Sequence, residues 1–452
     1  MRQPASPPHS FSSAAQRLAA DSRVERASLW AVVLVALASR LYQAWIFNRY
    51  QPNSIARLVH GDEPSYNCAA LDLLHGLGFH AADRLPLYPA WIALLHALSS
   101  ENYNVIPVAQ AFLGTGTVLL TYLLARRVFG HWPALVAAAL AAGSYAMTRQ
   151  SLYVLTEVMF TPALLLVVIT LWDAMERPSV ARFAWAAVWV GVADMVRPTL
   201  LFFPLWVAAA LVLFWGVRRG GRYAVVYVLA AALVVAPWTL RNYLRFHTFL
   251  PLSTSNATLW LASPEYYHLV RDKGYSYDRV WDDVIYPDDR SVPYPTSIEG
   301  DRYWSRRAKR SILAEPLVYA KYSAEKLVTY WVGDPEANWA GTHPLNYTLL
   351  RQRGVRTGTI AIVLIERTLI LFALAGALVL RRRWRLLLPL YLMVSYNMAL
   401  HAATVARTRM SEPLMPFLLV VIAGAAAQLV AARAGRGARH DAPPALTPTV
   451  AL

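Results

Sequence analysis

Long apolar runs alternate with short polar segments along most of the chain, and basic residues gather at the ends of the runs. A helix needs about 20 mostly apolar residues to cross a bilayer, and on this basis the pattern predicts about ten membrane-spanning helices. The predicted spans are residues 29–47, 103–124, 132–146, 152–171, 181–196, 199–215, 223–238, 360–380, 384–400 and 413–432. The pattern therefore predicts an all-α polytopic membrane protein.

Two further segments have a different pattern. Residues 84–100 are apolar, but the run is short and is interrupted by an arginine, two prolines and a histidine. This length and these mixed faces are typical of a helix that lies on the membrane surface. Residues 311–333 are also amphipathic and indicate another interfacial helix.

The basic clusters test this arrangement, because Lys and Arg gather on the cytoplasmic side of a membrane. With the N-terminus inside, alternation through the spans brings every short basic cluster to the inner face. These clusters are Arg23 and Arg26, Arg126 and Arg127, Arg177 and Arg182, residues 218–222, residues 381–385, and Arg433, Arg436 and Arg439. Counting residues 84–100 as a span would break this agreement, which supports their interfacial assignment.

The same alternation divides the chain into parts. We expect a cytoplasmic N-terminal tail at residues 1–28, a transmembrane domain at residues 29–432 and a cytoplasmic C-terminal tail at residues 433–452. Within the transmembrane domain, residues 48–102 form a first outer loop with interfacial helices, and residues 239–359 form a long outer loop.

Composition supports this picture. The hydrophobic fraction is 57%, the charged fraction is 15% and the mean hydropathy is +0.35, more apolar surface than a soluble protein of 452 residues could bury. The net charge of +16 does not indicate a nucleic-acid partner, because the arginines mark topology. The single cysteine, Cys68, excludes an intrachain disulfide and argues against a thiolate metal cluster.

Charged residues on the predicted outer face indicate a functional site, because ionisable groups at a membrane are costly. Asp62 and Glu63 stand side by side in the first outer loop, and arginines occur in several other outer segments. A carboxylate can accept a proton in a transition state, and an arginine can hold a phosphate through two parallel hydrogen bonds. Because nucleotide sugars are absent outside the cytoplasm, these residues predict chemistry on a lipid-linked phosphate donor.

An ordered series of motifs resembles a known family. The segments "GDEPSY", "RLPLYPAWIALLHAL", "YLLARRVFG", "YVLTEVMFTPALLL", "ADMVRPTLLFFPLW" and "RTRMSEPLMPFLLVV" resemble the GT-C superfamily of polyprenyl-phosphate-sugar glycosyltransferases. The most similar branch is bacterial and is related to the protein O-mannosyltransferases and the lipid A aminoarabinose transferase. The resemblance covers residues 29–432.

The resemblance implies a GT-C-like helix bundle. It also implies sugar transfer from a polyprenyl-phosphate donor to a lipid, glycan or protein acceptor, on the periplasmic face of the bacterial inner membrane. The family places a catalytic Asp in the first outer loop, which corresponds to Asp62. The resemblance does not extend to the lumenal β-trefoil domain of eukaryotic protein mannosyltransferases or to the C-terminal soluble domain of some bacterial relatives, so it does not identify the acceptor.

These considerations give a set of candidate site residues. We predict that Asp62 is the general base of an inverting displacement, with Glu63 as a second catalytic candidate. The candidate substrate and phosphate ligands are Tyr66, Arg84, Glu157, Arg197, Arg241, Asn242, Arg407 and Arg409. No cofactor or divalent metal is expected, because the arginines supply positive charge and no cluster of His and Asp ligands is evident.

Several candidates also have a structural interpretation. Asp62 could cap the helix that follows it, and Glu63 could stabilise the first turn of that helix. Arg84 could snorkel toward lipid head groups. Glu157 requires a partner or a cavity, and Arg197 could be that partner or a phosphate ligand.

The remaining candidates leave similar alternatives. Tyr66 could be an interface anchor, and Arg241 with Asn242 could belong to an ordinary helix terminus. Arg407 and Arg409 run against the positive-inside trend, which favours phosphate binding. Two other functions stay open for the whole chain, a lipid-sugar transporter and a non-catalytic membrane scaffold. A transporter would predict charges near the middle of the membrane and an internal repeat, and neither is visible in the sequence.

Overall fold

The computed structural model describes residues 11–59, 61–255, 257–287, 292–332 and 357–440. The ends of both predicted tails and residues 333–356 of the predicted long outer loop lie outside these ranges. The described residues fold into helices joined by turns and contain no strand. This confirms the all-α prediction.

Every predicted span overlaps a helix. These helices are α1 (Phe11–Tyr50), α4 (Val105–Phe129), α5 (His131–Gly143), α7 (Glu157–Glu176), α8 (Val180–Asp194), α9 (Phe203–Phe246), α15 (Thr357–Val379), α16 (Leu388–Ala403) and α18 (Met415–His440). Among the described residues, 5 helices are long and apolar enough to cross a membrane. Helices α5, α8 and α16 have 13, 15 and 16 residues, fewer than the about 20 that a full crossing needs. The number of crossings therefore stays a prediction.

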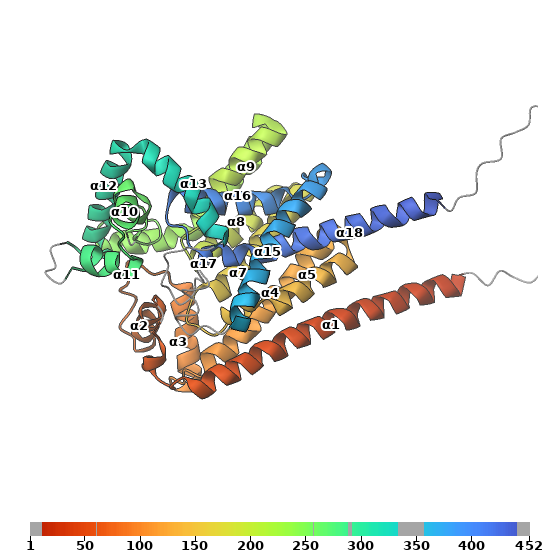
Figure 1. The fold of residues 1–452 in the computed structure, drawn as a ribbon, viewed down its shortest axis with the longest axis horizontal. Helices are drawn as coiled ribbons and strands as arrows, with labels where there is room; N and C mark the ends of the chain where they lie inside the picture. Colours follow the sequence, from red (N-terminus) through yellow and green to blue (C-terminus); the bar gives the residue numbers. More distant parts are fainter. Residues whose placement is uncertain (1–10, 60, 256, 288–291, 333–356, 441–452) are drawn as a thin grey trace, which may run out of the picture.

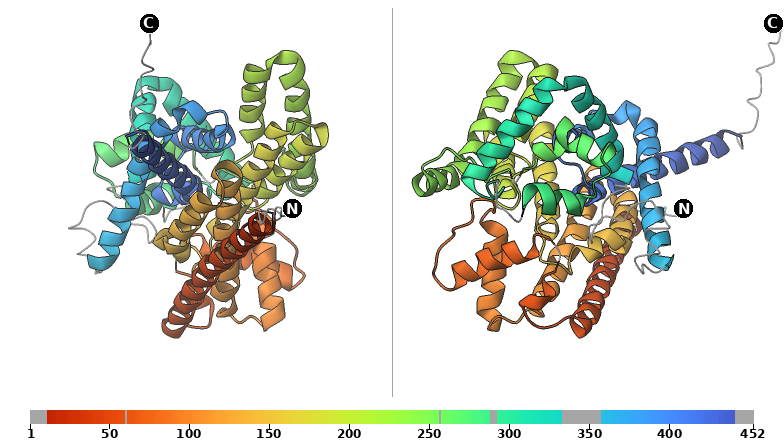
Figure 2. Two further views of the ribbon diagram at one scale, coloured as in Figure 1. Left: turned by 90° about the vertical axis from the view of Figure 1, so that its right-hand side faces the viewer. Right: turned by 60° about the vertical axis from the view of Figure 1, so that its left-hand side comes forward.

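Helix α9 combines two predicted spans into one hairpin. Its 44 residues are interrupted at Gly216, whose φ of 75° is non-helical and is readily adopted only by glycine. Gly220 lies so close to Leu211 that a Cβ on it would approach the Leu211 carbonyl oxygen to 2.1 Å. A straight helix would separate these two residues by about 13 Å, so the chain reverses here, and Figure 2 shows the two arms side by side.

Helix α5 packs into the bundle through small residues. Ala134, Ala137, Ala138 and Ala141 of α5 are fully buried, and this helix packs against α4 and α18. Small side chains let helices approach closely, which replaces hydrophobic driving force inside a membrane. The alanine-rich composition of α5 therefore has a packing role.

The two predicted outer loops meet at one end of the molecule. The first contains α2 (Glu63–Leu74) and α3 (Leu87–Ser99), and the long loop contains α10 (Pro264–Arg271), α11 (Tyr277–Val280), α12 (Ile298–Ala314) and α13 (Pro316–Val332). Figure 1 shows these helices at one end of the molecule. The N-terminal end of α1 and the C-terminal end of α18 lie at the opposite end. This arrangement agrees with two loops on one face and both tails on the other.

The long outer loop is a folded unit with its own apolar core. The Trp260 and Trp304 rings contact each other at a tilt of 58°, with their centroids 4.8 Å apart, and both side chains are fully buried. The Arg307 side chain forms an ion pair with Glu265 beside them. The predicted interfacial helix at residues 311–333 is divided between α12 and α13, because Glu315 precedes a proline and takes a non-helical conformation.

Candidate active site

Asp62 lies between two arginines from distant parts of the chain. Its Oδ1 atom accepts a hydrogen bond from Arg84 Nη2 at 2.9 Å, and its Oδ2 atom accepts one from Arg409 Nη2 at 3.1 Å. Asp62 immediately precedes α2, but its side chain makes no capping hydrogen bond to that helix. The side chain is 28% exposed. The carboxylate is therefore held by charge and remains reachable from outside.

A second carboxylate completes the group. Glu157, in the first turn of α7, is 1% exposed. Its Oε1 atom accepts a hydrogen bond from Arg197 Nη1 and forms an ion pair with Arg409 Nε, both at 2.8 Å. Arg409 therefore bridges Asp62 and Glu157 through two different nitrogen atoms. We refer to Asp62, Arg84, Glu157, Arg197 and Arg409 as the outer ion-pair cluster.

Tyr66 and Ser65 orient Arg84 within the cluster. The Arg84 guanidinium lies 4.7 Å from the centre of the Tyr66 ring, and Arg84 Nε donates a hydrogen bond to Ser65 Oγ at 2.9 Å. The Tyr66 backbone N–H donates to the Asp62 carbonyl oxygen, so one turn of α2 positions both side chains. Tyr66 thus lies at the cluster, where it supports an arginine.

Neighbouring charges set the protonation of these groups. Burial would raise the pKa of Asp62, but the guanidinium groups of Arg84 and Arg409 hold it below its usual value of 3.8. Asp83 contacts Arg84 at 3.5 Å, and its burial raises the pKa of that carboxyl group. Asp62 is therefore a carboxylate under ordinary conditions and a weak base for its type.

Arg407 lies beside the cluster. Its guanidinium stands 3.7 Å from the centre of the Tyr277 ring, a cation–π contact with the long outer loop. With Arg407 included, four arginines (Arg84, Arg197, Arg407 and Arg409) meet three carboxylates (Asp62, Asp83 and Glu157). Among these seven residues the arginines outnumber the carboxylates by one, and arginines are suited to holding an anionic ligand.

Glu63 contacts the segment before α7. It is 2% exposed, and its Oε1 atom accepts a hydrogen bond from the backbone N–H of Val154 at 2.8 Å. This bond ties the first outer loop to the segment before α7. The structure therefore gives Glu63 a structural contact.

Arg241 and Asn242 lie apart from the cluster. The Arg241 guanidinium stands 4.8 Å from the centre of the Trp238 ring and donates a hydrogen bond to Asn242 Oδ1 at 2.9 Å. Asn242 Nδ2 donates to the carbonyl oxygens of Leu250 and Leu252. Both residues hold the turn that follows α9, as the structural interpretation of this helix end expects.

Sequence reasoning did not identify the helix that holds the arginine segment. Residues 403–410, which contain Arg407 and Arg409, are bound to α13 by a set of hydrogen bonds that we refer to as the α13 clamp. Tyr319 Oη, Lys326 Nζ and Tyr330 Oη donate to the carbonyl oxygens of Ala403, Thr404 and Met410 at 2.6, 2.7 and 3.1 Å, and Thr408 Oγ1 donates to the Thr329 carbonyl oxygen at 3.4 Å. The only signal in the sequence was the amphipathic pattern of this helix, which does not identify a partner.

Asp83 was also missed. It directly precedes Arg84 in the sequence, and a carboxylate next to a candidate phosphate ligand is a signal that could have been used. The Asp83 side chain pairs with the same Arg84 guanidinium that is bonded to Ser65 of α2.

Comparison with known proteins finds a similarity over part of the chain. Residues 83–240 match the model of the dolichyl-phosphate-mannose-protein mannosyltransferase family. This range contains Arg84, Glu157 and Arg197 of the cluster, whereas Asp62 and Arg409 lie outside it.

Two curated relatives are undecaprenyl phosphate-alpha-4-amino-4-deoxy-L-arabinose arabinosyl transferases. The protein from Pseudomonas fluorescens (strain Pf0-1) is 32% identical over 181 residues, which cover 38% of this chain and 31% of the relative. The protein from Pseudomonas aeruginosa (strain UCBPP-PA14) is 29% identical over 240 residues, which cover 49% of this chain and 42% of the relative. The match thus spans less than half the length of either relative.

A solved structure extends the similarity to nearly the whole fold. The archaeal oligosaccharyltransferase AglB from Archaeoglobus fulgidus, solved with an inhibitory peptide and a dolichol-phosphate, superposes with a TM-score of 0.55 and 16% identity. The superposition covers 94% of this chain and 53% of that protein. The chain thus resembles the dolichyl-phosphate-mannose-protein mannosyltransferase family in sequence over residues 83–240 and has the fold of the GT-C glycosyltransferases, which confirms the resemblance inferred from its motifs.

Proposed function

We propose that this protein is a membrane glycosyltransferase that moves a sugar from a polyprenyl-phosphate donor to the hydroxyl group of an acceptor. The observation that supports this most directly is the Asp62 carboxylate, held between Arg84 and Arg409 at the end of the bundle where the two outer loops meet. The two arabinosyl transferase relatives make an undecaprenyl-phosphate-linked pentose the first donor to test.

In the proposed reaction, the acceptor oxygen attacks the anomeric carbon of the donor sugar. A bond forms between these two atoms while the bond from the anomeric carbon to the phosphate oxygen breaks, and the acceptor proton passes to Asp62. One displacement of this kind inverts the anomeric configuration. The low pKa of Asp62 suits a late proton transfer, because the acceptor hydroxyl becomes strongly acidic once its oxygen has begun to bond to the sugar.

The leaving phosphate is assigned to the side of the cluster where Arg197 and Arg409 meet. Each of these side chains is 13% exposed, and Glu157 fixes both from behind through one oxygen atom. Arginines preorganised in this way stabilise negative charge that develops on the phosphate oxygens as the bond breaks. Arg84 belongs to the opposite side of Asp62 and is assigned to orienting the base.

The proposed location is the periplasmic face of the bacterial inner membrane. Both outer loops lie at the end of the molecule away from the termini (Figure 1), and the basic clusters of the sequence assign those termini to the cytoplasm. The lipid chain of the donor would remain among the spans while its phosphate reaches the cluster.

We also propose that transfer requires no divalent metal, because arginines supply the positive charge at the phosphate. Adding excess EDTA to the purified enzyme should leave the rate within about twofold of its untreated value. A rate that falls with EDTA and returns with Mg²⁺ or Mn²⁺ would refute this part of the proposal.

The test of the function is a donor screen with purified protein in nanodiscs. Undecaprenyl-phosphate-linked pentoses and hexoses are offered with a mixture of hydroxyl acceptors, and released undecaprenyl phosphate is measured. A matched arm measures binding of undecaprenyl phosphate itself to wild-type protein and to Arg197→Gln. We expect release with at least one donor and weaker binding in the variant. Neither release nor binding with any donor would overturn the glycosyltransferase assignment and favour the scaffold alternative.

A further inference from the structure

The corner between α12 and α13 exposes large apolar side chains. Helix α12 ends at Ala314 and α13 begins at Pro316, and Figure 1 shows the two helices meeting at the edge of the outer end of the molecule. Leu313 and Leu317 flank this junction and are 81% and 84% exposed, more than any other large apolar side chain that the structure describes. We refer to residues 309–321 as the outer corner. Exposed leucines grouped in this way mark a surface that another molecule covers.

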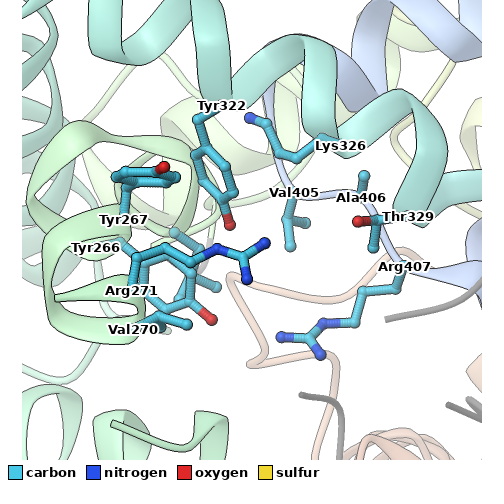
Figure 3. A pocket seen from close by; sticks show the side chains of 11 residues that line it. Tyr266, Tyr267, Val270, Arg271, Tyr322, Lys326, Thr329, Val405, Ala406 and Arg407 are labelled. Carbon is cyan, nitrogen blue, oxygen red and sulfur yellow. The ribbon is translucent and has the colours of Figure 1, made fainter. Parts of the chain in front are cut away.

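Helix α13 continues the apolar surface away from the corner. Its outward face carries four exposed residues, Leu317, Ala320, Ala324 and Val328. This spacing places the four side chains on one face of a helix. The opposite face is directed toward the arginine segment, and Figure 3 shows Tyr322, Lys326 and Thr329 of that face lining a small pocket with residues 405–407. The apolar face of α13 is therefore turned away from the protein.

Lipid is the partner that suits this apolar face. Helix α13 packs against α15 and α16, which overlap predicted spans, so the apolar face begins beside helices that lie in the bilayer. A helix with one apolar and one polar face is typical of a segment in the membrane interface. A soluble anion would leave Leu313 and Leu317 uncovered, whereas a lipid surface covers both.

Basic side chains flank the two leucines. Lys309 and Arg310 lie one turn before Leu313 on α12, and Lys321 lies one turn after Leu317 on α13; all three are exposed. Neither Lys309 nor Arg310 forms an ion pair with a described residue. Leucines bordered by lysine and arginine are typical of a helix that binds an anionic membrane surface, where each cation adds to the attraction toward lipid phosphates.

The carboxylates near the corner already have partners. Glu315 is the single acidic residue among residues 309–321, and its Oε2 atom lies 3.0 Å from His268 Nε2. Lys321 Nζ lies 3.9 Å from Glu325 Oε1, and the Lys321 side chain is 65% exposed. An ion pair as exposed as this one is weak. The outer corner therefore presents mainly positive charge to a surface that approaches it.

We propose that the outer corner binds anionic phospholipids of the leaflet on the side of the two outer loops. Leu313 and Leu317 enter the head-group layer, and Lys309, Arg310 and Lys321 contact lipid phosphates around them. The contact also sets the position of the arginine segment, so that sugar transfer depends on anionic lipid. This second part rests on the proposed glycosyltransferase function, whereas lipid binding itself does not.

Helix α13 connects the outer corner to the outer ion-pair cluster. Its 17 residues span about 25 Å, and its inward side chains hold residues 403–410 through the α13 clamp. Arg409, in that segment, bridges Asp62 and Glu157. Lipid that anchors the corner end of α13 therefore restricts the helix that holds Arg409, without touching the cluster.

The test of lipid binding uses the full-length protein in nanodiscs, with a fluorescent probe at the corner. Cys68 is the single cysteine, so Cys68→Ser combined with Leu313→Cys leaves one labelling position. Spin-labelled phosphatidylglycerol or phosphatidylcholine, at equal mole fraction, quenches a probe at the lipid surface. The matched control is Glu299→Cys, an exposed position at the other end of α12. We expect quenching at the corner, with phosphatidylglycerol about tenfold more effective, and little quenching at the control.

Charge variants test which residues select the anionic lipid. Lys309→Gln with Arg310→Gln removes two cations of the corner and should bring the two lipids within about twofold of each other. Lys273→Gln removes an exposed cation of the same outer loop outside the corner and should keep the preference. An equal loss in Lys273→Gln would assign the preference to the overall charge of the loop and refute the corner as its source.

Two further results would overturn lipid binding at the corner. Equal quenching by the two lipids in the wild-type background would refute selection for negative charge. An unquenched corner probe, beside a quenched probe at the exposed Leu233 of α9 (Leu233→Cys), would show that lipid does not reach the corner. Disulfide crosslinking of Leu313→Cys between copies would then assign the corner to a second copy of the chain.

Transfer measured in the same nanodiscs tests the coupling to the arginine segment. Phosphatidylglycerol should raise the kcat of the wild-type enzyme about threefold over phosphatidylcholine alone, and Lys309→Gln with Arg310→Gln should lose this dependence while keeping the rate in phosphatidylcholine. A dependence that persists in the variant would refute the coupling. If the probe shows the lipid preference but wild type transfers no sugar from any donor, the lipid site stands and the glycosyltransferase assignment fails.

Discussion

Replacing Asp62 by Asn tests the chemistry with little change in shape. The wild-type carboxylate accepts one hydrogen bond from Arg84 and one from Arg409. Asn keeps one accepting oxygen but replaces the other by an amide that donates, so one of the two hydrogen bonds is lost. Since the Asp62 side chain makes no capping bond to α2, the helix itself should form normally in the variant.

The structure allows both effects of this substitution to be estimated. A general base contributes about 10²–10⁴-fold in rate, and a base whose pKa is well below the working pH belongs at the lower end, so we expect a fall of about 10²-fold. The loss of one charge-assisted hydrogen bond costs about 1–2 kcal/mol, after reduction for the 28% exposure of the side chain. Arg409 keeps its ion pair with Glu157, so neither arginine loses every partner.

The assay is release of undecaprenyl phosphate by wild type and Asp62→Asn in nanodiscs, each measured from about pH 3 to pH 8. Because the pKa of Asp62 is lowered below 3.8, the carboxylate stays ionised and wild-type activity should fall only below that pH. The same lowered pKa means that Asp62 stabilises the folded protein above its usual pKa, and that this contribution disappears as the pH falls through the native value.

Two outcomes would refute the reasoning about Asp62. A folded Asp62→Asn protein that transfers sugar at the wild-type rate would show that the carboxylate is not the base. A wild-type activity that declines with a midpoint near pH 6 would show that the essential group has a raised pKa. In that case a different acid or base limits the reaction.

Further substitutions and fusions test the other assignments. Arg409→Lys should lower transfer about 10²-fold, because Lys cannot bridge two carboxylates, whereas Arg241→Lys, which lies apart from the cluster, should stay within about twofold; equal effects would contradict the assignment of the phosphate site. Glu63→Ala should lower the free energy of unfolding by about 1–3 kcal/mol by leaving the Val154 N–H unbonded, and Glu63→Gln should transfer sugar normally; a transfer defect in the stable Gln variant would return Glu63 to the chemistry. Reporter fusions after Arg222 and Gly274 should read cytoplasmic and periplasmic, respectively; the opposite pattern would reverse the orientation.

The helices of the bundle could be predicted because lipid imposes one strong requirement on each of them. A run of apolar residues long enough to approach a bilayer width has few alternatives to a helix, and the Arg clusters then order the runs. Helix lengths were less predictable. Helix α9 continues past the predicted span end to Phe246, because hydrogen bonds of Asn242 to the following turn support the extra residues.

The candidate site could be predicted only in part, for a physical reason. Asp62, Glu157 and Arg197 were identified because a charge next to an apolar run is costly and requires an explanation. Their partners, such as Arg84 and Arg409 for Asp62, come from segments that are distant along the chain, and a sequence does not specify how those segments meet. Glu63 illustrates the point, since it stands next to Asp62 in the chain but turns toward Val154. Arg241 was selected for its charge, although aromatic rings account for its position.

The α13 clamp has a consequence for exchanging parts between related enzymes. Three side chains of α13 bind the backbone of residues 403–410, so the outer loop and the arginine segment have to match each other in position. A chimera that takes only the long outer loop from a relative would place Arg407 and Arg409 against a helix that was not selected to hold them. The smallest unit that can be transplanted therefore combines α13 with residues 403–410. These two segments are separated in the sequence but have to be exchanged together.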